Sequence, residues 1–169
     1  MVLVRTQDYH AFVTLFDRYR ARVVSFATRM TGDISEAEGI ARDAFVEMSA
    51  RASRFKQKMP FKPWLFTIVH EFVSARLAKH DPASGASIDA LADGEPASEN
   101  APSPSKIEQA KPIFEAMGRL KPPYREVACL RIFEQMSYKD IATITGEKVK
   151  TVLSRMNYVV EHLRKGRSR

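Results

Sequence analysis

The segment from Ser137 to Met156, SYKDIATITGEKVKTVLSRM, has the pattern of two helices joined by one tight turn. Ser137 is a residue type that starts helices, because its hydroxyl accepts a hydrogen bond from a backbone N–H of the first turn, where Asp140 is the third helical residue. Gly146 suits the turn, because glycine adopts a positive φ at no steric cost. The segment therefore predicts a short helix, a turn and a second helix, an arrangement typical of a helix-turn-helix.

The second predicted helix has an apolar side and a polar side. A helix-turn-helix places such a polar helix start in the DNA major groove, where arginine binds guanine or phosphate and lysine binds phosphate. A plain helical hairpin with a solvated basic side fits the same pattern, so these residues alone leave both interpretations open. The predicted buried residues are Val149, Val152, Met156, Val159 and Leu163, and the predicted DNA-binding residues are Lys148, Lys150, Thr151, Ser154 and Arg155.

Charge is unevenly distributed along the 169 residues, whose net charge is +7. Residues 1–80 contain 13 basic and 8 acidic residues, and residues 106–169 contain 14 and 7. Residues 81–105 contain 5 acidic residues and no lysine or arginine. Two basic blocks that flank an acidic one favour a polyanionic partner, most often nucleic acid, although many basic proteins bind none.

The first block, residues 1–80, is predicted to contain three helices. Apolar residues recur three and four positions apart over residues 8–30, as they do along one side of an amphipathic helix. Ser35, with Glu38 three residues later, has the form of a capping box that would begin the second helix. The prolines of segment 60–63 would mark the start of the third helix, since proline fits the first helical turn.

The middle segment, residues 81–105, is rich in proline, alanine, serine and acidic residues. Such a composition buries too little apolar surface to offset the entropy of ordering, so we predict a flexible acidic linker. In the second block, residues 106–169, Ser105 with Glu108 forms another possible capping box, and Pro122 is expected to start a further helix. Nothing has the alternation of a strand. The predicted fold class is all-α, with two small helical domains joined by the linker.

The sequence argues against several classes of protein. The four histidines and the one cysteine have neither the H-E-x-x-H nor the C-x-x-C spacing of a metal site, and the phosphate-loop and G-x-S-x-G motifs are absent. We therefore expect neither an enzyme nor any cofactor, metal or small-molecule substrate. Cys129 lies among apolar helix residues, which predicts a buried and unreactive thiol.

The lack of recognisable targeting segments also favours one compartment. The N-terminus has no apolar signal-peptide region, and no run of about 18 apolar residues is present to span a membrane. A single cysteine fits a reducing environment. We therefore expect a cytoplasmic protein without membrane insertion.

Several motifs together resemble a known family. Residues 119–165 contain L-x-P-x-x-R-E-V, then S-Y-x-D-I-A, then T-V-x-S-R-M, and they resemble region 4 of the bacterial extracytoplasmic-function (ECF) sigma factors. Three earlier segments resemble region 2 of the same family. They are FVTLFDRYRARVVSFATRM at 12–30, GDISEAEGIARDAFVEM at 32–48 and PFKPWLFTIVHEFV at 60–73. The resemblance covers nearly the whole chain outside the linker, and the order and spacing of the blocks match.

This resemblance implies a transcription initiation factor with two DNA-binding domains. Region 2, residues 1–80, would dock on core RNA polymerase and bind the −10 promoter element. Region 4, residues 106–169, would bind the −35 element through the second helix of the helix-turn-helix, and an anti-sigma factor is an expected partner. Trp64, on the apolar side of the third helix, is expected in the core rather than at DNA. The implied polymerase contacts are Glu38, Arg42, Asp43 and Glu47, and the implied −10 contacts are Arg54, Lys56, Lys58, Lys62, Thr67, His70, Glu71 and Ser74.

Three groups of residues depart from the family pattern. Gly39 and Arg42 replace residues of an acidic-leading motif, Glu71 replaces an amide near the captured base, and Leu153 stands where lysine is common. A carboxylate close to phosphate is repelled, so Glu71 puts the −10 function in question. A second hypothesis is therefore a sigma-like interaction protein that binds an anti-sigma factor or polymerase without opening promoters. The remaining departures are Thr67, His70, Ala75, Asn157 and Tyr158.

Overall fold

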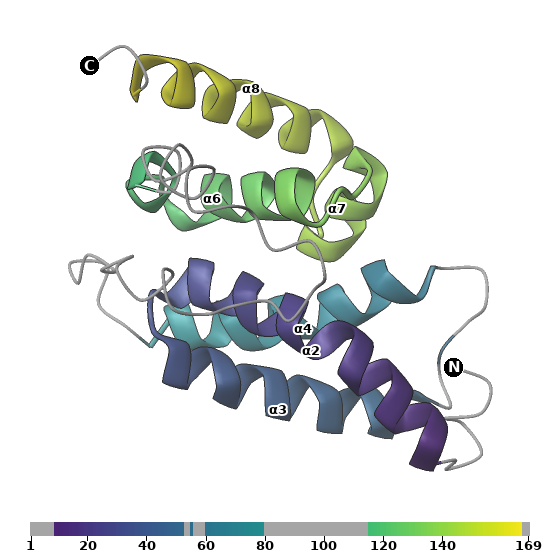
Figure 1. Cartoon of the computed structure of the whole chain (residues 1–169). Helices are drawn as coiled ribbons and strands as arrows, with labels where there is room; N and C mark the ends of the chain where they lie inside the picture. The colour runs from purple at the N-terminus through teal and green to yellow at the C-terminus, as the bar shows by residue number, and fades with distance from the viewer. Residues whose placement is uncertain (1–8, 53–54, 56–59, 80–114, 167–169) are drawn as a thin grey trace.

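The computed structural model describes residues 9–52, 55, 60–79 and 115–166, and everything described in it is helix, turn or irregular chain. Its helices form two units that lie against each other (Figure 1). The N-terminal unit consists of the described residues up to 79, and the C-terminal unit consists of residues 115–166. The predicted linker 81–105 lies outside the described residues, as does the predicted cap at Ser105 and Glu108.

The N-terminal unit contains α2 (Tyr9–Thr31), α3 (Ile34–Ala50) and α4 (Phe61–Leu77). Each helix packs against the other two. The periodic apolar residues of all three face inward, and Phe26, Phe45 and Phe66 are among the side chains buried completely. Each Å² of apolar surface that is buried stabilises the fold by about 25 cal/mol. A helix with a periodic apolar side gains this free energy only by packing that side inward, and for this reason the periodicity is sufficient to predict the three helices.

The predicted start of α3 is wrong by two residues. Asp33, not Ser35, is the N-cap, and its carboxylate accepts a hydrogen bond of 2.9 Å from the backbone N–H of Glu36. Gly32 precedes it with a φ of 78°, which ends α2 and turns the chain directly into the cap. The sequence contained two acceptable caps, and the tight turn selected the earlier one.

The C-terminal unit contains α6 (Pro122–Ala128), a π-helical turn η3 (Cys129–Phe133), α7 (Tyr138–Thr145) and α8 (Val149–Gly166). The predicted cap of α7 is confirmed, because Ser137 Oγ accepts a hydrogen bond of 3.1 Å from the N–H of Asp140. The predicted turn is confirmed as well, since Gly146 has a φ of 68° and ends α7 in the left-handed conformation. The segment 137–166 is therefore a helix-turn-helix.

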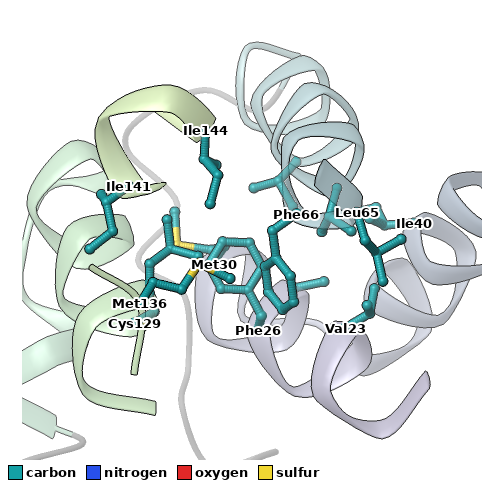
Figure 2. Packing of buried hydrophobic residues seen from close by; sticks show 14 of the residues in the cluster. Val23, Phe26, Met30, Ile40, Leu65, Phe66, Cys129, Met136, Ile141 and Ile144 are labelled. Atoms are coloured by element: carbon teal, nitrogen blue, oxygen red, sulfur yellow. The ribbon is translucent and has the colours of Figure 1, made fainter. Parts of the chain in front are cut away.

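The two units share one hydrophobic core. Helix α4 packs against α7, and α2 packs against α6 and η3. Figure 2 shows Phe26 and Met30 of α2 between Phe66 on one side and Met136 and Ile144 on the other. Helix α8 packs on α6 and α7 and lies on the side of the C-terminal unit that faces away from the N-terminal unit (Figure 1). One side of α4 is therefore covered by the C-terminal unit, whereas the outer side of α8 is not covered by the N-terminal unit.

Arg125 connects the two units by hydrogen bonds. Its Nη1 donates to the carbonyls of Arg29 and Met30, at 3.4 and 3.2 Å, in the last turn of α2. Its Nη2 donates to the carbonyls of Gly118 and Leu120, at 2.7 and 3.0 Å. These α2 carbonyls belong to a helix end, where no helical N–H follows to bind them. Burial lowers the pKa of Arg125, yet arginine stays protonated, so a full positive charge faces the negative end of the α2 dipole.

Replacing Arg125 by methionine keeps an apolar stem but leaves buried carbonyls without donors. We expect the free energy of unfolding in urea to fall by roughly 3 kcal/mol, given the usual cost of unmade hydrogen bonds to a charged group. Arg119→Met, at an exposed position of the same unit, is the matched control and should change stability by less than about 0.5 kcal/mol. Equal effects of the two substitutions would show that the Arg125 bonds do not stabilise the fold.

The two glycines Gly39 and Gly146 should respond to alanine in opposite directions. Gly39 is inside α3, where an added Cβ meets only the Arg42 guanidinium at 3.9 Å, so Gly39→Ala should stabilise by roughly 0.5–1 kcal/mol. Gly146→Ala places a Cβ at positive φ and should destabilise by roughly 1–2 kcal/mol although the space is open. Denaturant midpoints at unchanged slope measure both, and shifts of the same sign would contradict this account.

Candidate nucleic-acid interface

Helix α8 presents a polar surface around its first turns. Lys148, Lys150 and Ser154 are exposed, and Thr151 is half-buried. Opposite them, Val152 and Val159 are fully buried against α6 and α7. Val149 was predicted to be buried, and this is wrong: it is 41% exposed, because the first residue of α8 lies beyond the edge of the packed surface. Two exposed lysines beside an N-terminal helix end give this surface a positive charge, which favours an anion over a cation.

Arg155 is held within the C-terminal unit. Its Nη2 lies 2.7 Å from Oε1 of Glu147, in the turn that connects α7 to α8, and the side chain is about one-fifth exposed. The pair links the turn to the second turn of α8. A guanidinium held in this way is available to DNA only if it exchanges Glu147 for a phosphate or a guanine, so the structure separates Arg155 from the freely exposed Lys148 and Lys150.

Helix α4 carries two different sets of the predicted −10 residues. Thr67, Glu71 and Ser74 follow the i, i+4, i+7 spacing of one helix side, on which Glu71 and Ser74 are exposed. Lys62 and His70 turn instead toward the C-terminal unit, where they meet two acidic residues. Arg54, Lys56 and Lys58 lie outside the described residues.

The carboxylate of Glu71 is already paired. Arg51 reaches it with both terminal nitrogens, at 3.0 Å from Nη1 to Oε1 and 2.8 Å from Nη2 to Oε2, and its Nε lies 2.5 Å from Oε1 of Glu47. These two hydrogen-bonded carboxylates raise the pKa of Arg51, with Glu71 contributing most. This two-point contact, the Arg51 fork, neutralises the charge of the Glu71 carboxylate more effectively than a single contact would. Glu71 therefore presents less repulsion to phosphate than its sequence position suggests.

Lys62 and His70 contact the C-terminal unit through Glu134 and Glu126. Lys62 Nζ lies 2.8 Å from Oε2 of Glu134 and donates to the Glu134 carbonyl at 2.5 Å, while Arg22 of α2 lies 3.6 Å from the same carboxylate oxygen. His70 Nδ1 lies 2.5 Å from Oε1 of Glu126. Sequence reasoning missed both acidic residues, although Glu126 stands inside the recognised R-E-V motif. For Glu126 the available signal was a charged residue directly before an apolar helix run, since a charge there is buried only if it is paired.

The predicted polymerase contacts lie on the outer surface of α3. Glu38, Arg42 and Asp43 are exposed, and Glu38 forms an ion pair of 3.4 Å with Arg20 of α2. Glu47 is part of the Arg51 fork described above. Between these charged residues Val46 is 65% exposed, which gives the surface an apolar centre. Apolar centres ringed by charge are common at protein interfaces.

Trp64 packs with other aromatic rings rather than pointing to solvent. Its ring lies 5.0 Å from that of Phe55 in an edge-to-face contact and 6.0 Å from that of Phe61. The half-buried ring packs against the common core, which confirms the structural role expected for it.

The single cysteine is buried as predicted. Cys129 is 1% exposed in the core between the two units, and burial raises the pKa of its thiol to about 12. The thiol therefore stays protonated and unreactive at neutral pH. Among the described residues, no three His, Cys, Asp or Glu side chains gather where a metal ion would bind. None of the helices in that part of the chain has the length and apolar character needed to cross a membrane.

The described residues define a class: an all-helical protein in which a helix-turn-helix unit is docked on a three-helix unit. The family model for Sigma-70 region 2 matches residues 15–82, and the model for Sigma-70, region 4 matches residues 111–163. The ECF RNA polymerase sigma factor SigW of Bacillus subtilis is 28% identical over 174 residues, which cover 96% of this chain and 91% of that protein. The RNA polymerase sigma factor CarQ of Myxococcus xanthus is 30% identical over 140 residues, covering 80% and 77%. This chain belongs to the ECF group of the sigma-70 family.

Solved structures share the fold, and two of them are complexes. CnrH in complex with the cytosolic domain of CnrY has a TM-score of 0.71 at 20% identity, covering 97% of this chain and 92% of that chain. The sigma factor RpoE in complex with the anti-sigma factor NepR from Bartonella quintana also has a TM-score of 0.71 at 20% identity, covering 96% and 98%. At this identity the likeness establishes the arrangement of helices.

The contact between the units should weaken as the pH rises. The hydrogen bond to Glu126 raises the pKa of His70, with burial acting in the opposite direction and Glu71 adding to the rise. A raised pKa means that protonated His70 stabilises the folded state fully below about pH 6.5, the ordinary value, and that this contribution disappears as the pH rises through the raised pKa. His70→Gln should therefore lower the melting temperature most on the acidic side. In a Glu126→Gln background that difference should lose its pH dependence, and a persistent dependence would assign it to other groups.

Proposed function

We propose that this chain is an alternative sigma factor that binds core RNA polymerase and directs it to a set of promoters. Membership of the ECF group supports this role, and so does the presence of a region 2 and a region 4 in one chain. In this proposal residues 1–80 dock on polymerase and bind the −10 element, residues 81–105 act as the connecting linker, and residues 106–169 bind the −35 element. The observation that carries the proposal is the exposed polar start of α8 at the end of a helix-turn-helix.

The −35 element would be recognised by the outer side of α8. Lys150 and Ser154 lie near the centre of that side, opposite the buried Val152, and Lys148 flanks the turn. Leu153 is 40% exposed at the edge of the same side. An exposed apolar side chain in a major groove suits the methyl group of thymine, so the leucine that replaces a common lysine would change base preference rather than abolish binding.

The −10 element would meet the outer side of α4, with Thr67, Glu71 and Ser74. The fork between Arg51 and Glu71 weakens the argument that Glu71 excludes DNA, and with it the hypothesis of a sigma-like protein that cannot open promoters. Glu38, Arg42, Asp43 and Glu47 remain the proposed polymerase contacts. An anti-sigma factor is a proposed partner, because two of the structures that share this fold are complexes, one with the cytosolic domain of CnrY and one with the anti-sigma factor NepR.

Transcription in vitro tests the proposal directly. Core RNA polymerase with this chain and a genomic template library should produce transcripts with defined start sites, and the absence of such transcripts would reject the sigma-factor role. Lys150→Ala should reduce initiation several-fold at promoters that depend on a −35 element, and it should lower the salt slope of DNA binding by about one. The matched control Arg119→Ala removes one exposed positive charge of the same unit and should leave both unchanged.

A further inference from the structure

Two apolar side chains remain partly in solvent at the start of α8. Val149 is 41% exposed and Leu153 is 40% exposed. Because they are four residues apart, they lie on the same side of the helix, with roughly 5–6 Å between their Cβ atoms. The periodicity of the sequence placed Val149 in the core, and Leu153 stands where lysine is common in the family, so neither is explained by core packing or by a contact to phosphate. We name Val149 and Leu153 the apolar pair.

Three rows of side chains run along the first turns of α8, each with two residues four positions apart. The central row consists of Lys150 and Ser154, which are both exposed. One edge row ends with Arg155, whose guanidinium is paired with Glu147. The opposite edge row is the apolar pair. The start of α8 is therefore polar in its centre and apolar along one edge, so its two edges suit different chemical groups.

The major groove of DNA presents an apolar group at thymine, whose C5-methyl lies at one margin of the base pair, beside the O4 acceptor. A recognition helix directs its first turns at the base edges. With the row of Lys150 and Ser154 over the centre of these edges, the apolar pair lies toward one margin of the groove. Four helical residues extend about 6 Å, and stacked base pairs are about 3.4 Å apart, so the apolar pair spans one or two base-pair steps.

We propose that Val149 and Leu153 bind the C5-methyl groups of two thymines in the −35 element, placed one or two base pairs apart. The apolar pair thereby selects thymine at both positions without a hydrogen bond to either base. This inference deepens the proposed function and rests on it for the role of α8.

Charge and size favour DNA over a protein as the occupant of this surface. Lys148 and Lys150 are exposed on either side of Val149 in the sequence, and the positive end of the α8 dipole adds to their field, so a polyanion is attracted to the place where the apolar pair lies. Two residues are also few for a specific protein interface, which buries about 1,200 Å² or more in total. Helix α8 lies on the side away from the N-terminal unit, so the free chain presents this surface (Figure 1).

Replacing thymine by deoxyuridine removes the C5-methyl and leaves every hydrogen-bonding group of the base in place. The full chain, at low salt, is first used to enrich a sequence from a library of duplex DNA with a randomised centre. Each thymine of the enriched duplex is then replaced in turn. At two thymines one or two base pairs apart, the replacement should weaken binding by roughly fourfold each in fluorescence anisotropy, which is the usual effect of one buried methyl group. Other thymines should respond by much less.

Alanine substitutions assign each methyl group to its residue. Leu153→Ala should weaken binding to the enriched duplex by a similar factor and make the chain insensitive to deoxyuridine at one of the two positions, and Val149→Ala should do the same at the other. The matched control is Val160→Ala. Val160 is 44% exposed on the same side of α8, but it lies about 10 Å beyond Leu153, past the turns that enter the groove. This variant should keep both responses, and far-UV circular dichroism verifies that all three chains are helical.

The outcomes separate this inference from the proposed function. It is overturned if no sequence is enriched, if deoxyuridine has no effect, or if its effect persists when Val149 and Leu153 are both alanine. Unchanged DNA binding by that double variant would also overturn it and would assign the apolar pair to a protein partner. Transcription by core polymerase with this chain is decided independently. Defined transcripts without methyl dependence would reject only the role of the apolar pair, whereas methyl-dependent binding without defined transcripts would reject only the sigma-factor role.

Discussion

One buried guanidinium holds the arrangement of the two units. Arg125 binds carbonyls at the end of α2 and carbonyls of the segment that leads into α6, and so it ties the last turn of α2 to the start of α6. The charge cannot be removed by deprotonation, and it is too deep to be solvated. The same boundary contains the packing of η3 on α2, the ion pair of Glu126 with His70 and the buried Cys129, all of which require the two units to stay in this arrangement.

The charges of the protein are divided between exposed and internal roles. Lys148 and Lys150 face solvent, where they attract a polyanion, whereas Arg51 and Arg155 form ion pairs within the chain. Exposed lysines contribute little to stability but much to encounter with DNA. The paired arginines hold helix positions and neutralise nearby carboxylates. The net charge of +7 therefore overstates the charge that is available to a partner.

The sequence predicted the helices well and their contacts poorly. Periodic apolar residues located α2, α3, α4, α7 and α8, because burial of one helix side is a local requirement that each segment meets through its own spacing. The same reasoning misplaced the cap of α3 and the burial of Val149, since both depend on what lies beyond the segment. The π-helical turn at Cys129–Phe133 and the positive φ of Gln135 left no local signal either.

For the candidate site, the sequence predicted which side of its helix each residue would occupy. This is possible because the position of a residue around a helix depends only on its spacing from the buried residues. The polar start of α8 and the structural role of Trp64 belong to this group. Which charges remain free was decided by tertiary structure. Glu71 meets Arg51 twenty residues earlier, and Lys62 meets Glu134 seventy-two residues later. Ion pairs form between side chains that the fold brings within a few ångströms, and no sequence period records such a distance.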